Sequence, residues 1–165
     1  MEVVVIMHNI RSILNVGSIF RTSEGFGVKK IYLSGYSPSP QHGLPHVQEK
    51  NKRQLHKTAL GAEKMVDNEY IEDIQKLISN LKSDGFLIIG LEQDKRSIPI
   101  NQLRNKTELP KKIALVVGEE VNGIEAKLRD LCDTIIEIPM QGQKESFNVS
   151  VATGIALYEI NRGQE

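Results

Sequence analysis

The hydrophobic positions of this chain alternate between short continuous runs and stretches with helical spacing. Runs rich in Val, Ile and Leu predict buried strands at residues 3–7, 30–34, 86–91, 113–117 and 134–138. Helical spacing predicts helices that end near Gly27 and Gly85, and further helices at residues 124–131 and 148–161. This alternation is typical of the α/β class, in which helices cover both faces of a mostly parallel sheet.

The segment after the second predicted strand is rich in turn-forming residues. Residues 35–57 contain two glycines and three prolines, so they are predicted to form a long loop. Such a loop in a small domain is usually functional or mobile. Residues 58–64 are predicted to form one or two helical turns, and Met65–Val66 a short strand.

Length and composition predict one soluble domain. The chain has 165 residues and no internal repeat or linker, so we expect a single domain over residues 1–165 without extensions. It has no apolar run long enough to cross a membrane and no secretory signal pattern, which favours a cytoplasmic location. The single cysteine, Cys132, excludes an internal disulfide and a cysteine-based zinc cluster. The 21 basic and 21 acidic residues balance, so a nucleic-acid partner must bind a local patch.

Three polar segments that follow predicted strands carry the candidate chemistry. They are residues 9–22, 118–123 and 139–148. Ligands of parallel sheets gather beyond the carboxyl ends of the strands, so we expect these segments to converge on one pocket. The third segment joins two apolar elements, and its backbone amides and carbonyls are suited to hold a small polar ligand.

Side chains in these segments also have purely structural interpretations. Asn15 is placed to cap a helix, with Arg21 about 9 Å further along its axis. A helical arginine is more often a solvated or salt-bridged surface residue. The two carboxylates at 119 and 120 complement the positive end of the next helix. Ser146 and Asn148 are suited to cap the last helix.

Together the three segments resemble the motifs of the SpoU (TrmH-like) RNA 2′-O-ribose methyltransferases of the SPOUT superfamily. The matching residues are Asn15-x-Gly17-x-x-x-Arg21-Thr22 with Phe26-Gly27, then Val117-Gly118-Glu119 with Gly123, then Ile138-Pro139-Met140, Gly142 and Ser146-x-Asn148-Val149-Ser150-Val151-Ala152. They occur in the family's order and at family-like spacing, so the resemblance covers nearly the whole chain. Ser18 and Phe147 depart from the family's usual Ala and Leu.

The resemblance implies a fold, a cofactor and an assembly. The fold is a SPOUT-type α/β sheet with a deep C-terminal trefoil knot, an exception to the rule that chains do not thread loops. The cofactor is S-adenosyl-L-methionine, held in the knot. The residues implied to bind it are Leu91, Gly118, Ile138, Ser146 and Phe147. A homodimer is also implied, with apolar residues of the first and last helices at an interface near the site.

The resemblance assigns catalytic roles to Arg21, Asn15, Glu119, Ser146 and Asn148. Arg21 would lie at the ribose 2′-hydroxyl and its phosphate. Because the pKa of a guanidinium is above about 12, Arg21 would stabilise a developing alkoxide rather than act as a base. Asn15 would orient Arg21 or the ribose, and Glu119 would fix Arg21 or take part in proton removal. Ser146 and Asn148 would hold the loop and the RNA backbone, and no metal is expected.

One basic concentration stands out in an otherwise neutral chain. It comprises Lys50, Lys52, Arg53 and Lys57, with three histidines nearby whose spacing does not suit a metal. A charge run is usually a solvated face, and the alternative is contact with RNA phosphates. Arg11 is a further candidate RNA contact.

Two other functions stay open. A nucleotide-dependent oxidoreductase on a Rossmann sheet requires a Gly-x-Gly-x-x-Gly turn after the first strand, but this strand leads into Asn9-Ile10-Arg11. A non-catalytic RNA-binding relative would keep the fold without turnover, although the joint retention of the five catalytic candidates argues against it. The sequence does not distinguish tRNA from rRNA.

Overall fold

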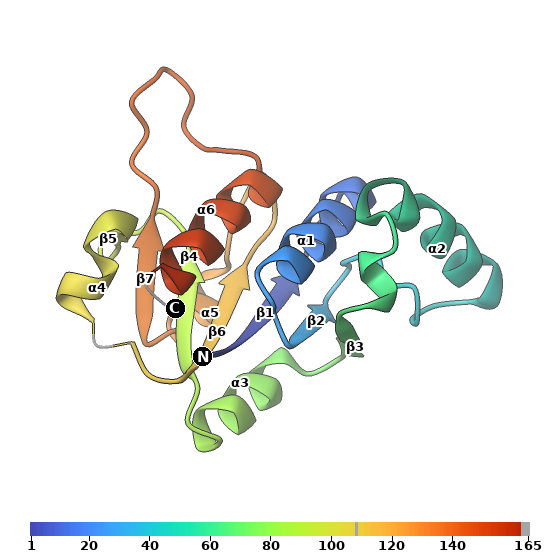
Figure 1. Cartoon of the computed structure of the whole chain (residues 1–165), viewed down its shortest axis with the longest axis horizontal. Helices are drawn as coiled ribbons and strands as arrows, with labels where there is room; N and C mark the ends of the chain where they lie inside the picture. Colours follow the sequence, from blue (N-terminus) through green and yellow to red (C-terminus); the bar gives the residue numbers. More distant parts are fainter. Residues whose placement is uncertain (108, 163–165) are drawn as a thin grey trace.

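The computed structural model describes residues 1–107 and 109–162, which are built around one seven-stranded sheet (Figure 1). The strands are β1 (Glu2–His8), β2 (Lys30–Ser34), β3 (Asp67–Ile71), β4 (Leu87–Leu91), β5 (Ile98–Pro99), β6 (Lys112–Val117) and β7 (Thr134–Glu137). They pair in parallel in the order β3-β2-β1-β6-β4-β7-β5. The carboxyl ends of the strands therefore share one edge, called the carboxyl edge below.

Helices cover both faces of this sheet, as the sequence predicts (Figure 1). They are α1 (Ile13–Gly25), α2 (Pro45–Ala59), α3 (Ile74–Ser83), α4 (Leu103–Lys106), α5 (Ala126–Arg129) and α6 (Val149–Asn161), with 3₁₀ turns η1 (Ala62–Lys64) and η2 (Ile100–Gln102). Buried residues of α1, α2 and α6 form one core with the sheet, and those of α3 and α5 form a second core on the opposite face.

The central strand β1 shows how the sequence produces these two cores. Val3, Val5 and Met7 lie in the core under α1 and α6. Val4 and Ile6 lie in the core under α3. Successive strand side chains point to opposite faces, so a strand covered on both faces requires an unbroken apolar run.

Two local predictions between β2 and α3 are wrong. Residues 35–57 are not one loop, because α2 begins at Pro45 and ends at Ala59, followed by an αL residue, Leu60, as its C-cap. Only Leu55 and Ala59 of α2 are buried, so the helix has too narrow an apolar stripe to be recognised. The strand predicted at Met65–Val66 begins instead at Asp67, because β3 is an edge strand with largely polar residues.

The start of α1 also differs from the prediction. Ser12 is its N-cap, and the Ser12 hydroxyl accepts a hydrogen bond from the backbone N–H of Asn15 at 3.3 Å. Asn15 therefore lies within the first turn, where its side chain is available for other contacts.

Gly17 of the first motif allows α1 and α2 to cross closely. A methyl group added at Gly17 would lie 2.1 Å from Thr58 Oγ1 and 2.6 Å from the carbonyl oxygen of Leu55. Thr58 Oγ1 donates a hydrogen bond to the carbonyl oxygen of Leu14 at 2.9 Å. This motif residue is thus required for helix packing rather than for ligand contact.

Among the helices of the described residues, none is long and apolar enough to cross a membrane.

Candidate active site

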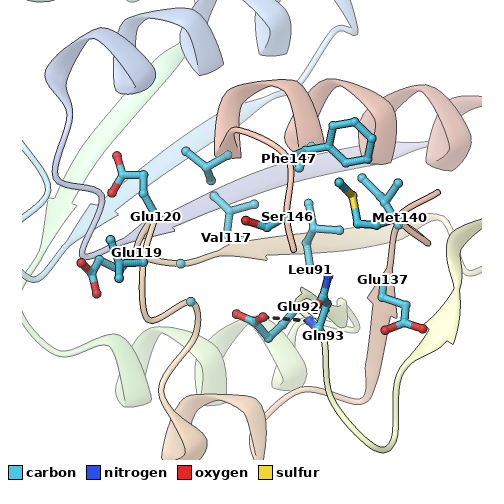
Figure 2. Close-up of a pocket in the computed structure, with 16 residues that line it drawn as sticks. Leu91, Glu92, Gln93, Val117, Glu119, Glu120, Glu137, Met140, Ser146 and Phe147 are labelled. Carbon is cyan, nitrogen blue, oxygen red and sulfur yellow. Dashed lines mark hydrogen bonds between the residues drawn. The ribbon is translucent and has the colours of Figure 1, made fainter. Parts of the chain in front are cut away.

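A cavity opens at the carboxyl ends of β4, β6 and β7, where the second and third motif segments meet (Figure 2). Its empty volume, including the open mouth, is about 690 Å³. All five residues predicted to bind the cofactor line it: Leu91, Gly118, Ile138, Ser146 and Phe147. Two of the three segments that were predicted to converge on one pocket therefore line this cavity, whereas no residue of segment 9–22 does.

The lining combines an apolar wall with several carboxylates. In Figure 2, Leu91 and Val117 lie in the middle of the cavity, with Met140 and Phe147 on one side. The carboxylates belong to Glu92, Glu119, Glu120 and Glu137. Such a lining suits a ligand that joins a flat, apolar ring to positively charged groups.

The turn after β6, residues 118–123, is closed by its own backbone. Glu119 donates its N–H to the carbonyl of Gly123 at 3.1 Å, and Gly123 donates its N–H to the carbonyl of Glu119 at 2.8 Å. A methyl group added at Gly118 would lie 2.5 Å from the backbone of Gly123. Gly123 itself has a φ of 67°, which favours glycine. The two motif glycines are therefore required because the backbone of this turn packs too closely for a side chain at either position.

Glu92 fixes the turn from β4. Its carboxylate accepts hydrogen bonds from the N–H of Ile124 at 2.7 Å and from the N–H of Gln93 at 2.8 Å. A methyl group added at Gly123 would lie 1.7 Å from Glu92 Oε2. Glu92 thus joins the β4 end to the β6 turn, a role that was not predicted from the sequence.

Glu120 holds the start of α1 against the β6 turn. Its carboxylate accepts hydrogen bonds from the backbone N–H groups of Arg11 at 2.9 Å and Ser12 at 3.0 Å, and from Asn15 Nδ2 at 2.9 Å. Burial alone raises the pKa of Glu120, but these hydrogen bonds outweigh it and hold the pKa below its usual value. Of the two adjacent carboxylates, only Glu119 was predicted to be a site residue, and the pair itself is the signal that points to Glu120.

Asn15 connects the first and third motif segments. Its Oδ1 accepts a hydrogen bond from Asn148 Nδ2 at 3.1 Å. Asn148 Oδ1 accepts from the N–H of Ser150 at 2.9 Å, so Asn148 is the N-cap of α6. The chain Glu120–Asn15–Asn148 therefore links all three motif segments beside the cavity, and the capping role predicted for Asn148 is confirmed.

Glu119 has a different partner from the one predicted. Its carboxylate, with its side chain 7% exposed, forms an ion pair with the guanidinium of Arg11 at 3.3 Å and accepts a hydrogen bond from the N–H of Asn122 at 3.2 Å. Within one chain, Glu119 therefore fixes Arg11 and not Arg21. Arg11 lies on the segment that follows β1, close to the turn, whereas Arg21 lies two helical turns further along α1.

Arg21 does not line the cavity of its own chain. Its side chain is exposed, and it forms no hydrogen bond or ion pair within residues 1–107 and 109–162. The neighbouring Thr22 and Phe26 line a shallow groove between α1 and α6, together with Val151 and Tyr158. Of the five catalytic candidates, Arg21 is thus the one that lies away from the others within a single chain.

The loop between β7 and α6, residues 138–148, projects away from the body of the molecule (Figure 1). Ser146 and Phe147 are exposed, although both line the cavity. Gln93 Nε2 donates a hydrogen bond to the carbonyl of Glu145 at 2.6 Å, which ties the returning arm of the loop to β4.

The predicted basic residues lie on α2, at a distance from the cavity along the sheet (Figure 1). All four are exposed. Lys52 and Arg53 line a groove beside α2, whereas Lys50 and Lys57 do not. Among the described residues, no cluster of three or more His, Cys, Asp or Glu side chains is placed to hold a metal.

Residues 2–158 match the model of the SpoU rRNA Methylase family. The chain belongs to this family. It is 32% identical over 165 residues to the tRNA (guanosine(18)-2′-O)-methyltransferase of Aquifex aeolicus, covering 99% of this chain and 71% of that enzyme. It is 29% identical over 161 residues to the 23S rRNA (guanosine-2′-O-)-methyltransferase RlmB of Coxiella burnetii, covering 97% of this chain and 58% of that enzyme.

The fold is also similar to solved structures. The AdoMet-bound rRNA methyltransferase of Sinorhizobium meliloti superposes with a TM-score of 0.81 over 98% of this chain and 56% of that one, at 23% identity. At this identity the match supports the fold alone. The predicted family and the mostly parallel α/β sheet are thereby confirmed.

Proposed function

We propose that this SpoU family protein is an S-adenosyl-L-methionine-dependent methyltransferase that acts on a ribose 2′-hydroxyl of tRNA or rRNA. The observation that carries the proposal is the hydrogen-bonded chain Glu120–Asn15–Asn148, which joins the three motif segments beside one cavity. The curated relatives support both RNA classes, since one modifies tRNA and the other 23S rRNA.

The cavity suits the proposed cofactor. Leu91, Ile138 and Phe147 provide an apolar wall for the adenine ring, and the carboxylates around the mouth attract the positively charged sulfonium and amino groups. When bound, S-adenosyl-L-methionine supplies an activated methyl group. The chain's own residues must then position the RNA hydroxyl and help to remove its proton, and positioning alone contributes about 7–11 kcal/mol in favourable cases.

Arg21 is proposed to act in the site of a partner subunit. It is exposed, unpaired within the described part of its own chain, and next to the groove between α1 and α6. A guanidinium that enters the partner's cavity would stabilise the alkoxide that develops as the 2′-hydroxyl loses its proton. Because the guanidinium is a poor base, the proton passes to an RNA phosphate or to water.

The α1–α6 groove is the proposed dimer interface. Val151 and Tyr158 of α6 line it and are 50% and 61% exposed, and Leu14 of α1 is 48% exposed. A contiguous exposed apolar surface of this kind marks a contact site. The homodimer and the position of Arg21 support one another, since the same interface completes the cavity.

Three further predictions from the sequence also remain proposals. We infer that residues 1–165 form one methyltransferase domain, and that the C-terminal part forms a trefoil knot. What supports the knot is family membership together with the strand order, in which β6 and β7 flank β4 before the chain returns to α6. A cytoplasmic location follows from the proposed RNA substrates.

The central test is Arg21→Ala. We expect methyl transfer from labelled S-adenosyl-L-methionine to total tRNA or rRNA to fall at least about 100-fold, the loss seen when a single group that stabilises an oxyanion is removed. Cofactor binding by calorimetry should persist, because Arg21 does not line its own cavity. Lys29→Ala is the control, since Lys29 is an exposed cation that precedes β2 at the opposite edge.

The test separates the proposal from its alternatives. Transfer at the wild-type rate by Arg21→Ala would overturn the role of Arg21. If the wild-type protein binds the cofactor and RNA without methylating either RNA class, it is a non-catalytic RNA-binding relative of the family. Mapping of the methylated ribose in an active sample then identifies the RNA.

A further inference from the structure

A second hollow lies beyond β3, outside the active-site cavity. This α2 groove is lined by α2, η1, β3 and residues 40–41, and carries the cationic side chains of Lys52, Arg53 and Lys64. Its one carboxylate, Glu63, already accepts hydrogen bonds from His56 Nδ1 at 2.7 Å and from the N–H of Gly61 at 2.9 Å. Lys52 is paired with Glu49, which does not line the groove, at 2.8 Å. The cations that line the groove still outnumber its carboxylate, in a chain whose charges balance overall.

Two stacked aromatic rings lie close in sequence to residues that line this groove. The imidazole of His42 stacks on Tyr70 of β3 with ring centroids 3.7 Å apart and an interplanar angle of 10°. The Tyr70 hydroxyl donates a hydrogen bond to the carbonyl of Gly35 at 2.7 Å, which anchors the stack to the end of β2. His42 is exposed, so the stacked pair presents a ring to solvent next to Gln41 of the groove.

Tyr36 continues this line toward the active site. Its side chain is 56% exposed, and its backbone N–H is held by Asn9 Oδ1 at 3.2 Å. Tyr36 shares a shallow depression with Arg11 and Glu119. Glu119 also lines the active-site cavity. Arg11 and Tyr36 thus adjoin the cavity through Glu119. The His42–Tyr70 stack lies between Gly35, which precedes Tyr36, and Gln41 of the α2 groove.

We propose that this line, named the edge track and formed by Arg11, Tyr36, His42, Lys52 and Arg53, binds the unpaired RNA that adjoins the methylated nucleotide. The inference rests on the proposed RNA methyltransferase activity and adds the substrate feature that the enzyme recognises. Arg11 and Tyr36 contact the nucleotide nearest the target ribose, and Lys52 and Arg53 contact phosphates further along the strand.

The chemistry of the track favours single-stranded over double-stranded RNA. Exposed rings stack on bases only where the base faces are free, whereas a duplex buries those faces. Between the β6 turn and β3 lie three strand spacings, about 14 Å at about 4.8 Å each, so the bound segment spans more than one nucleotide. Cations spaced along such a track follow the phosphates of the strand.

The first experiment compares two double variants of α2 that remove the same charge. Lys52→Gln with Arg53→Gln removes the two groove cations that α2 carries and leaves Lys64 in place. Lys50→Gln with Lys57→Gln removes two exposed cations of the same helix outside the groove. A labelled, unpaired RNA oligonucleotide of mixed sequence is titrated at salt concentrations from about 50 to 200 mM.

The groove variant is expected to bind about tenfold more weakly, with a salt slope smaller by about 1.4, or about 0.7 for each lost phosphate contact. The Lys50/Lys57 variant should keep the wild-type slope. Equal losses in the two variants would overturn the track, because they would indicate a diffuse charge effect. No loss in either variant would overturn it as well.

The second experiment tests the stacking contacts. Tyr36→Ala and His42→Ala are each expected to weaken binding of the unpaired oligonucleotide about tenfold, whereas Tyr36→Phe should retain it. Binding of a fully paired RNA duplex should be unchanged in both alanine variants. An equal loss for duplex and single strand, or no loss for either RNA, would overturn the proposal.

These binding measurements are independent of turnover. If the wild-type protein methylates no RNA, the proposed function fails, and the oligonucleotide titrations still decide whether the track exists. If the protein is active, the groove variant should raise KM for the RNA about tenfold while kcat is retained. A loss of kcat at unchanged KM would contradict a role in docking.

Discussion

The two walls of the active-site cavity are built in opposite ways. In the β6 turn, a methyl group added at Gly118 would lie 2.5 Å from backbone atoms, and both ends of the turn are hydrogen-bonded. In the β7–α6 loop, a methyl group added at Gly142 would meet no atom within 4 Å. The turn is thus a fixed wall that can orient reacting groups, and the loop is an adaptable wall that can follow a ligand.

The largest expected difference between the walls comes from alanine at these two glycines. Gly118→Ala should lower the free energy of unfolding by about 2–3 kcal/mol, because backbone atoms of Gly123 must move. Gly142→Ala should change it by less than about 0.5 kcal/mol. Urea denaturation of the two variants measures both values. Equal stabilities would show that the turn is no more rigid than the loop.

The β6 turn and the β7–α6 loop should also differ in how much their side chains contribute to stability, and Glu120 of the turn tests this. Glu120→Ala removes the acceptor of three hydrogen bonds from the start of α1, and we expect a loss of about 2 kcal/mol of stability. Methyl transfer should also fall, because Asn15 loses its anchor. Glu145→Ala is the control, since Glu145 is an exposed carboxylate of the loop. A stable, fully active Glu120→Ala variant would refute the anchoring role.

Site residues that belong to a family motif could be predicted from the sequence, whereas elements and contacts that depend on tertiary packing could not. The five cofactor candidates were assigned from the resemblance to the family's motifs, and all five line the cavity. Helix α2 was missed because only Leu55 and Ala59 of it are buried. The partner of Glu119 was also missed, because a spacing along α1 does not show which arginine folds back onto the turn.

The stability that Glu120 contributes should depend on pH. Hydrogen bonds hold its folded-state pKa below the ordinary value of 4.5, although burial opposes the shift. The contribution is therefore fully present above the unfolded pKa and is lost as the pH falls through the lower, folded pKa. Thermal unfolding of the wild type and of Glu120→Gln between pH 7 and pH 3 should show the difference in Tm shrinking at the acid end. A difference that grows toward low pH would contradict this assignment.

Asn148 lies where the loop meets α6 and has two separable contacts. Asn148→Ala removes the helix cap and should cost about 1 kcal/mol of stability. Asn148→Asp keeps a capping oxygen but cannot donate to Asn15 Oδ1, so stability should be largely retained while methyl transfer falls. Denaturation and transfer assays on both variants separate the cap from the link. Equal activity of Asn148→Asp and the wild type would remove Asn148 from the site.

The smallest effect is expected at Phe147, the residue that departs from the family's usual Leu. Its side chain is 42% exposed at the cavity mouth, so Phe147→Leu removes a ring that solvent already reaches. The dissociation constant of S-adenosyl-L-methionine, measured by calorimetry, should change by less than about threefold, because little apolar area is lost from the contact. A loss of affinity well above about threefold would contradict this prediction, because it would show that the exposed ring makes a contact with the cofactor that Leu cannot replace.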